Sequence, residues 1–285
     1  MTPSSVPPAR YSSYVLVLPA YNEEARIARV LEYYRAFAPV LVVDNLSTDR
    51  TPAIARELGV EVVPYRNAGT CQTPEWFRHV ASLIPTDHFA LLSCSEHVPP
   101  RLLERFDEIA RGSSAGVVSC RRRSYTCGKL IPRLWDETDV ERFFDRRELD
   151  YDAIEIHGSF RPLRPERLVA LPDGDGLVIS HLRDFDAESL LRKATDYAVV
   201  EAADRVRLGK STTLRWLLGQ LLTEVFRFVR IRPASWSRIA LREIWARMVM
   251  HSVIYWIGWE TRSGEGLARS RERTDALWRE LVRRP

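Results

Sequence analysis

Residues 40–63 read VLVVDNLSTDRTPAIARELGVEVV. The opening apolar run is typical of a strand buried on both faces, and the polar residues 45–49 after it predict a turn. Thr51 and Pro52 then predict the start of a helix, with threonine as its cap and proline at its first position. Gly59 can end that helix, and residues 60–63 form the next apolar run. The stretch therefore predicts a complete strand–helix–strand unit.

The same alternation continues on both sides of this stretch. Residues 14–19 predict an earlier strand, followed by a helix for which Asn22 is the predicted cap. Thr73 and Pro74 open a further helix, residues 89–94 predict a fourth strand, and the helix after it stops at Gly112. Alternation of this kind predicts an α/β fold with a mostly parallel sheet.

Polar clusters follow three of the predicted strands, at residues 21–24, 44–49 and 93–97. Ligands of parallel sheets bind at the carboxyl ends of the strands. The three clusters are therefore expected to converge on one crevice.

Composition sets broad limits. The chain has 285 residues, 45% hydrophobic and 28% charged, with a net charge of +4, as in a globular domain whose ligand is an anion or a membrane surface. No nucleic-acid partner is expected. The longest uncharged apolar stretch, residues 248–259, is too short to span a bilayer. The four cysteines form no CxxC pair, so no structural zinc site is expected. A large, cysteine-poor chain predicts reduced thiols in a cytoplasm. Residues 1–12 predict a disordered lead without a signal core.

Three segments together resemble the family 2 glycosyltransferases of the GT-A fold. They are VLVLPAYNEEARIARVLE (15–32), the opening stretch (40–63), which is close to the pattern V-V-D-x-x-S-x-D-x-T, and SCSEHVPPRLLERF (93–106). Looser matches at 121–129, 155–158 and 179–197 are similar to bacterial lipopolysaccharide-type and exopolysaccharide-type members.

The resemblance implies a GT-A domain, a Rossmann-like mostly parallel sheet flanked by helices, over residues 13–208. A helical C-terminal extension would occupy residues 209–285. The implied activity is transfer of a sugar from a nucleotide-activated donor to a hydroxyl acceptor, with inversion at the anomeric carbon, as in polysaccharide biosynthesis. The acceptor stays open between a glycan, a lipid-linked saccharide and a small metabolite.

Donor contacts are expected in the first two polar clusters. Asp44 lies at a strand end, where it can accept a hydrogen bond from a base N–H, and the resemblance places it against the nucleobase. Asn22 can equally be a plain helix cap, and Asp49 a turn-stabilising side chain. The residues that resemble the family's nucleobase and ribose loop, or belong to the same donor site, are Pro19, Tyr21, Asn22, Glu23 and Ser47.

The third cluster departs from the family. Its usual D-x-D motif is replaced by Ser93-Cys94-Ser95. Ser93 and Ser95 are expected to share one face of the strand and to hydrogen-bond ribose or phosphate oxygens. Serine hydroxyls are weak ligands for Mg²⁺ or Mn²⁺. The cofactor is thus either none or a weakly bound divalent cation held by Glu96 and His181, and Glu96 can also be a solvated strand-end residue.

Positive charge for the donor's diphosphate is expected from a basic segment. Arg122 and Lys129 are the preferred donor-binding residues, with Arg121 and Arg123 beside them, because arginine can grip phosphate oxygens with two donors. The alternative is an exposed charged strand edge. The resemblance places His181 near the phosphates or the metal, although a lone histidine is more often a structural hydrogen-bonder.

The resemblance places the acceptor-side acidic residue, and with it the acid–base chemistry, in DYDAIEIHG (150–158). Glu155 and His157 are the candidate catalytic residues, since they lie two apart and one strand face can present both. Asp152 lies in the same segment. The family more often shows a carboxylate directly after the histidine position, where this chain has Gly158.

The last quarter of the chain is helical and rich in arginine and tryptophan. Its basic amphipathic helices can lie in a membrane interface, or pack on the catalytic domain or on a second subunit in a homodimer. Packing is the simpler account of the stripe as a whole. The stripe consists of Leu214, Leu217, Leu218, Leu221, Leu222, Val225 and Phe226.

Two rival functions are open. A nucleotidyltransferase would show a glycine-rich basic loop after its first strand, where this chain has PAYNEE (19–24). A degenerate, non-catalytic nucleotide-sugar-binding protein would account for the loss of both aspartates of the D-x-D motif.

Overall fold

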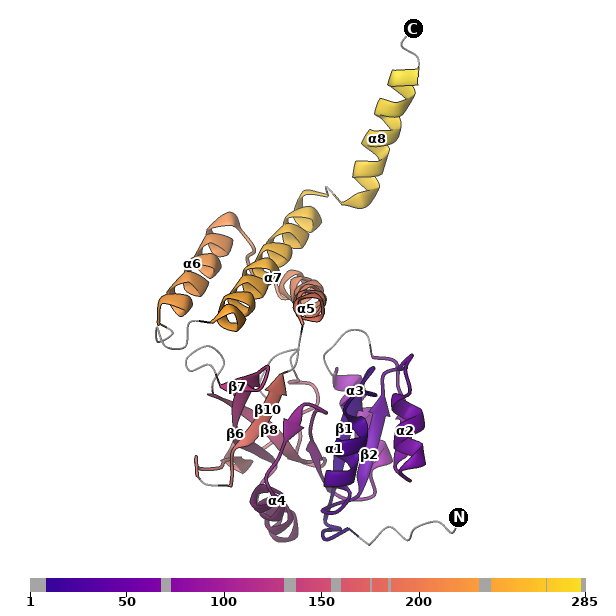
Figure 1. The fold of residues 1–285 in the computed structure, drawn as a ribbon, viewed down its shortest axis with the longest axis vertical. Coiled ribbons are helices and arrows are strands. Elements are labelled where there is room, and N and C mark those ends of the chain that lie inside the picture. Colours follow the sequence, from indigo (N-terminus) through magenta and orange to yellow (C-terminus); the bar gives the residue numbers. More distant parts are fainter. Residues whose placement is uncertain are drawn as a thin grey trace. The chain divides into compact units, whose positions relative to one another are not determined.

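The computed structural model describes residues 9–67, 73–130, 137–154, 160–174, 176–183, 186–230, 237–264 and 266–282. The chain divides into two compact units. The first holds the described residues up to Arg183, and the second holds those from Asp186 onward. Figure 1 shows the sheet of the first unit and the helices of the second.

A ten-stranded sheet organises the described part of the first unit, in the order β3-β2-β1-β4-β8-β6-β10-β5, with β7 and β9 paired to β6. Strands β1 to β4 are parallel, and antiparallel β8 joins β4 to β6. The strands are β1 (Tyr14–Ala20), β2 (Val40–Asp44), β3 (Glu61–Pro64), β4 (His88–Leu91), β5 (Glu96–His97), β6 (Val117–Thr126), β7 (Lys129–Leu130), β8 (Glu137–Asp145), β9 (Leu168–Ala170) and β10 (Ile179–Arg183).

The helices follow the strands closely along the chain. In the first unit they are α1 (Ile27–Tyr34), α2 (Thr51–Glu57), α3 (Pro74–Leu83) and α4 (Pro100–Gly112), with a short 3₁₀ helix at Pro165–Arg167. The second unit consists of α5 (Ala187–Arg207), α6 (Leu214–Arg230), α7 (Arg238–Ser263) and α8 (Leu267–Val282).

Both faces of the sheet are covered, which explains the continuous apolar runs. In β1, Leu16 and Leu18 pack with helices α1 and α4 on one face, whereas Val15 and Val17 pack with Phe77 of α3 on the other. A strand buried on both faces has no polar side, so its sequence does not alternate. The predicted α/β class with a mostly parallel sheet is confirmed at the positions that decided it.

The predicted helix starts are right in one case and wrong in two. Thr73 caps α3, because its hydroxyl accepts a hydrogen bond from the Trp76 N–H at 3.3 Å. Asn22 is not a cap: α1 begins at Ile27, and Asn22 has a positive φ of 53°. Thr51 is the first residue of α2 and not its cap. In both wrong cases the side chain accepts a hydrogen bond from another loop instead. Asn22 accepts from the Thr48 N–H, and Thr51 accepts from the Glu23 N–H.

The predicted helix ends are confirmed, whereas the predicted strand before the third polar cluster is too long. Gly59 follows α2 with a positive φ, and α4 ends at Gly112, as predicted. Asp186 caps α5, accepting from the Ser189 N–H at 2.7 Å. Strand β4 is shorter than predicted, because the chain turns after Leu91 and pairs again as β5, antiparallel to β10.

The helical unit begins earlier than the expected C-terminal extension. Helix α5 packs on α7, with Ala198 and Ala202 buried against Ile254, so it belongs structurally with α6 and α7. The functional boundary at residue 208 stays a prediction. Within the described residues, none of the helices combines the length and the apolar character needed to cross a bilayer.

Candidate functional site

Two loops at the carboxyl ends of β1 and β2 are tied together by hydrogen bonds. The Asn22 carboxamide oxygen accepts from the Thr48 N–H at 2.8 Å, and the Asn22 N–H donates to the Ser47 hydroxyl at 2.9 Å. The Glu23 N–H donates to the Thr51 hydroxyl at 2.7 Å. The structure thus brings together three predicted donor-site residues, Asn22, Glu23 and Ser47, in one interlocked pair of loops.

Asp44 anchors the second of these loops. Its carboxylate accepts from the Ser47 N–H at 3.1 Å and from the Ser47 hydroxyl at 2.5 Å, and the residue is only 4% exposed. Pro19 lies beside Val43 in the β1–β2 ladder, whereas Tyr21 is 56% exposed. Asp44 therefore has a structural role in the turn, whatever it contacts in a ligand.

Asp49 has the turn-stabilising role that was one of its two interpretations. Its carboxylate accepts from the Thr51 N–H at 2.9 Å and from the Glu24 N–H at 3.1 Å. Burial alone would raise the pKa of Asp49, but the hydrogen bonds from Thr51 and Glu24 bring that pKa below its ordinary value. Asp49 is thus held as the anion by the loop itself.

The third polar cluster presents two hydroxyls side by side. The Oγ atoms of Ser93 and Ser95 are 2.9 Å apart, so the two serines share a face as predicted. The Ser93 N–H turns back to donate to Glu96 Oε2 at 3.0 Å. The turn after β4 therefore places the serines directly beside the Glu96 carboxylate.

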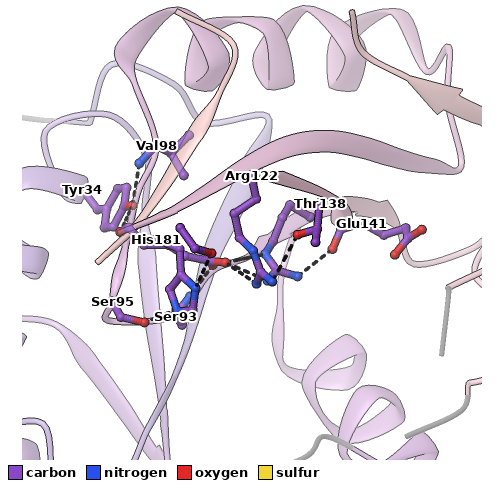
Figure 2. A network of polar contacts seen from close by, with 11 residues as sticks. Tyr34, Ser93, Ser95, Val98, Arg122, Thr138, Glu141 and His181 are labelled. Carbon is purple, nitrogen blue, oxygen red and sulfur yellow. Dashed lines mark hydrogen bonds and ion pairs between the residues drawn. The ribbon is translucent and has the colours of Figure 1, made fainter. Parts of the chain in front are cut away.

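Glu96 is buried in an ion-pair cluster, and the expectation of a solvated strand-end residue is wrong. The residue is 3% exposed, and its carboxylate accepts from Arg142 Nη2 at 2.7 Å and from Arg122 Nη1 at 3.3 Å. Arg142 Nε also reaches both carboxylate oxygens, at 3.1 and 3.2 Å. Figure 2 draws Arg122, His181 and the two serines as members of this polar network.

Sequence reasoning missed Arg142, which makes the shortest contact to Glu96. The pairing of β8 with β6 shifts register at this point, from Val118 opposite Phe143 to Ser119 opposite Glu141. Arg142 is the extra residue, and a bulge of this kind redirects a side chain out of the normal alternation. Nothing local in the sequence marks the bulge.

The cluster holds Glu96 firmly ionised. Burial alone would raise the pKa of this carboxyl, but Arg142 first and Arg122 second outweigh burial and lower the pKa to about 2. His181, which lies opposite Glu96 in the β10–β5 pair, acts in the same direction. Its Nδ1 lies 3.4 Å from the Ser124 hydroxyl.

These residues do not fit the weak divalent-cation site that sequence analysis considered at Glu96 and His181. Both oxygens of Glu96 already accept hydrogen bonds from guanidinium groups, and two arginines share one carboxylate. The surplus charge of this cluster is positive, which repels a dication. Within the part of the chain that the structure describes, no cluster of three or more histidine, cysteine, aspartate or glutamate side chains could hold a metal.

Of the three consecutive arginines, the middle one pairs with Glu96. Arg121 pairs with Asp139 at 3.4 Å and Arg123 with Glu137 at 2.6 Å, both across to β8. Arg122 points to the other face of β6, as alternation requires, and reaches Glu96. Lys129 is exposed in the short strand β7, at the far end of the β6–β7 hairpin.

The two loops and the serine cluster lie at the same edge of the sheet. Strand β1 lies between β2 and β4, and the Leu92 N–H donates to the Val17 carbonyl beyond the end of β4. The first and third clusters are also close enough to interact electrostatically. Burial raises the pKa of the Cys94 thiol, and the nearby Glu23 carboxylate raises that pKa further. The predicted convergence of the three clusters on one edge is therefore borne out by the strand order.

Only some residues of the candidate base segment, 150–158, are described by the structure. Glu155 and His157 lie outside the described residues. Asp152 is described, with its side chain 90% exposed and ion-paired with Arg78. Asp150 accepts hydrogen bonds from the N–H groups of Asp152 and Ala153.

A family model described as "Glycosyl transferase family 2" matches residues 15–168, more than half of the chain. That span contains the β1 and β2 loops, the serine cluster and the Glu96 ion pairs. The fold is thus the GT-A fold expected from the sequence. No curated protein matches the chain.

Two solved structures that resemble the chain are the following. Glucosyl-3-phosphoglycerate synthase from Mycobacterium tuberculosis, in complex with Mn²⁺, UDP and glucosyl-3-phosphoglycerate, is 18% identical with a TM-score of 0.40, over 66% of this chain and 78% of that one. The mannosyltransferase PcManGT from Pyrobaculum calidifontis, in complex with GDP-Man and Mn²⁺, is 16% identical with a TM-score of 0.42, over 97% and 84%.

The Glu96 cluster predicts a specific pH dependence of stability. Glu96→Gln leaves buried Arg142 without its anion, so it should lower the free energy of unfolding by about 3–5 kcal/mol near neutral pH. The ion pairs contribute fully above the unfolded pKa of about 4.3 and are lost as the pH falls through the folded pKa of about 2. The difference between wild type and variant should therefore shrink by roughly 3 kcal/mol across that window.

Denaturant unfolding at a series of pH values measures this difference. Glu61→Gln, at an exposed position of β3, is the control and should differ little from wild type at any of these pH values. A Glu96→Gln difference that does not change between pH 5 and pH 2 would contradict the assignment of a low pKa to this group.

Proposed function

Since the chain belongs to glycosyl transferase family 2, we propose that it transfers a sugar from a nucleotide-activated donor to a hydroxyl acceptor. The transfer inverts the configuration at the anomeric carbon and needs no divalent cation. The observation that carries the metal-independent part is the surplus of positive charge at Glu96, beside two serines that replace carboxylates. Each further step of the proposal rests on one part of the described edge of the sheet.

The donor's nucleoside is assigned to the interlocked loops of β1 and β2. The hydrogen bonds of Asn22 with Ser47 and Thr48 support this assignment, because a loop that is already ordered loses little conformational entropy when a ligand binds. Asp44 at the end of β2 supplies the acceptor for a base N–H. The exposed ring of Tyr21 is suited to cover the base.

The donor's diphosphate is assigned to the serine cluster. Ser93 and Ser95 offer hydroxyl donors, and Arg122, whose side chain is 23% exposed, brings a guanidinium group to the same place. Glu96 and Arg142 fix the position of that guanidinium. When the bond to the sugar breaks, negative charge grows on the leaving diphosphate, and a fixed cation stabilises that charge. Lys129 remains a second candidate for phosphate contact.

The acceptor hydroxyl needs a base within hydrogen-bond reach. We assign this role to Glu155, with His157 as the alternative, and both come from the acceptor-side segment of the family resemblance. The base takes the acceptor proton as its oxygen attacks the anomeric carbon from the side opposite the leaving diphosphate, which inverts the configuration.

A cytoplasmic location agrees with the chemistry of the thiols. Cys94 and Cys120 are free thiols, as is usual in a reducing compartment. The acceptor classes that fit are a growing glycan, a lipid-linked saccharide or a small metabolite, and polysaccharide assembly is the setting that the resemblance favours.

The proposal predicts donor binding that does not need a metal. In a thermal-shift screen across nucleoside diphosphates and nucleotide sugars, the correct donor should raise the melting temperature equally with Mn²⁺ and with EDTA. The shift should fall with added salt, because screening weakens partly exposed charge pairs. Loss of the shift in EDTA with recovery in Mn²⁺ would establish a metal site instead.

Arginine variants sharpen this test. Arg122→Gln should weaken donor binding in EDTA, whereas Arg123→Gln, which loses the pair with Glu137 on the other face of β6, should bind like wild type. Turnover of the same donor, followed as released nucleoside diphosphate, checks that binding leads to transfer. Equal binding by both variants would remove Arg122 from the site.

Asp44 is predicted to carry much of the nucleotide affinity. Asp44→Ala removes a charge-assisted hydrogen bond of about 1.5–3 kcal/mol, so calorimetry should show binding weaker by roughly ten-fold or more. Asp49→Ala is the control, because it loosens the same loops without touching Asp44. Equal losses in the two variants would assign the effect to loop geometry and not to base recognition.

The base assignment predicts a loss of turnover without a loss of donor affinity. Glu155→Gln should lower turnover by about 10²–10⁴-fold, because proton removal from the acceptor then has no positioned base. His157→Ala tests the alternative, and donor affinity by calorimetry is the control in both. Normal turnover in both variants would move the search to Asp152 or Asp150.

A further inference from the structure

Helix α6 turns an apolar face outward in the second unit. It packs on α7 through Leu217 and Glu224, which are 8% and 1% exposed. Six other apolar residues, spaced to follow one stripe of the helix, are 46–63% exposed. They are Leu214, Leu218, Leu222, Val225, Phe226 and Val229.

A buried ion cluster fixes this orientation. The Glu224 carboxylate contacts Arg227 at 2.7 Å, Arg247 at 2.8 Å and His251 at 3.4 Å. Burial alone would raise the pKa of Glu224, but the contacts from His251, Arg247 and Arg227 lower it to about 2. Rotating α6 to bury its stripe would break the contacts of Glu224 with Arg247 and His251 on α7, at the cost of separating buried charges. The outward stripe is therefore a fixed feature of the second unit.

Helix α7 carries a matching stripe. Leu241, Trp245, Trp256 and Trp259 are 51%, 51%, 54% and 39% exposed. Their spacings of 4, 11 and 3 residues keep them within one narrow strip of the helix surface. This strip lies away from α5, which packs on the side of α7 that contains Ile254.

The two stripes lie on the same side of the helix pair. Contacts of Thr212 with Arg262 and of Glu224 with Arg247 show that α6 and α7 run antiparallel. Trp216, whose ring centroid is 4.5 Å from the Arg205 guanidinium, marks the side of α6 next to α5. At 100° per residue, both stripes fall on the opposite side. The ten residues of the two stripes are called the outer surface below.

Charge is distributed unevenly along the chain. Residues 186–285 hold 19 lysines and arginines against 12 aspartates and glutamates, whereas residues 1–185 hold 23 against 26. The net charges are therefore +7 and −3. Three arginines of the helix pair, Arg215, Arg230 and Arg238, are exposed. The net positive charge of the chain therefore comes from the helical unit.

We infer that the outer surface docks on an anionic lipid bilayer. Leucine, phenylalanine and tryptophan on one face with arginines around them match the composition of helices that lie in a membrane interface. Tryptophan is favoured at that depth because its ring is apolar and its N–H is polar. Anionic headgroups attract the positive charge of the unit. A second copy would instead bring a like charge of +7 against it.

Membrane binding also favours one acceptor class, and this choice of acceptor rests on the proposed function. An enzyme held at a bilayer meets acceptors that are concentrated there, so a lipid-linked saccharide becomes the favoured acceptor over a free metabolite. The membrane contact itself is independent of the reaction, and it can be tested on the protein without any donor.

Flotation with vesicles tests the contact. The full chain should float with vesicles of equal parts phosphatidylglycerol and phosphatidylcholine at low salt, and less with phosphatidylcholine alone or at high salt. The double variant Leu222→Glu with Phe226→Glu should lower the bound fraction about ten-fold or more, because charges are costly in the apolar layer. Val199→Glu, at a 54% exposed position of α5, should float like wild type.

Two further measurements keep the outcomes separate. Tryptophan emission of the wild type should shift to shorter wavelength with the anionic vesicles, which needs no variant. Nucleotide affinity of the double variant should equal that of wild type, so a failure of the proposed reaction would not affect this result. Absence of flotation and of the emission shift would overturn the inference. So would light scattering that shows a wild-type dimer converted to a monomer by the double variant.

Discussion

The ion pairs of Glu96 with Arg142 and Arg122 are the constraint on which the candidate site depends. They join three strands that are far apart in the sequence, β5, β8 and β6. The carboxylate also accepts the Ser93 N–H, so the turn that presents the two serines is held by the same group. Removing one partner would leave a buried charge, and the geometry of the turn would lose its support.

Periodicity and turn chemistry predicted the frame of the fold because they act locally. The strands β1 and β2 and the cap at Thr73 follow from apolar runs and from a side chain that reaches its own helix. Asn22 failed as a cap because its carboxamide bonds to Thr48, which is 26 residues away. A competing partner across a loop cannot be read from the residues beside it.

The site was predicted in part for the same reason. Ser93 and Ser95 share a face, as alternation requires, and Arg122 is the one arginine of its run that reaches them through Glu96. The burial of Glu96 could not be predicted, because it depends on Arg142 in a bulge 46 residues later. A bulge changes which face a side chain occupies, and the pattern of β8 contains no sign of it.

The same electrostatic arrangement occurs in both units, with a different structural role in each. In each, a nearly buried glutamate is shared by two arginines and lies near a histidine, and its pKa is lowered to about 2. At Glu224 the arrangement fixes the rotation of a helix, and its apolar side is turned outward as a result. At Glu96 it fixes a turn, and the surplus positive charge lies beside two hydroxyls at the edge of the sheet. A cation supplied by the chain needs no loading from solution, so under the proposed function the diphosphate site has its positive charge without a metal.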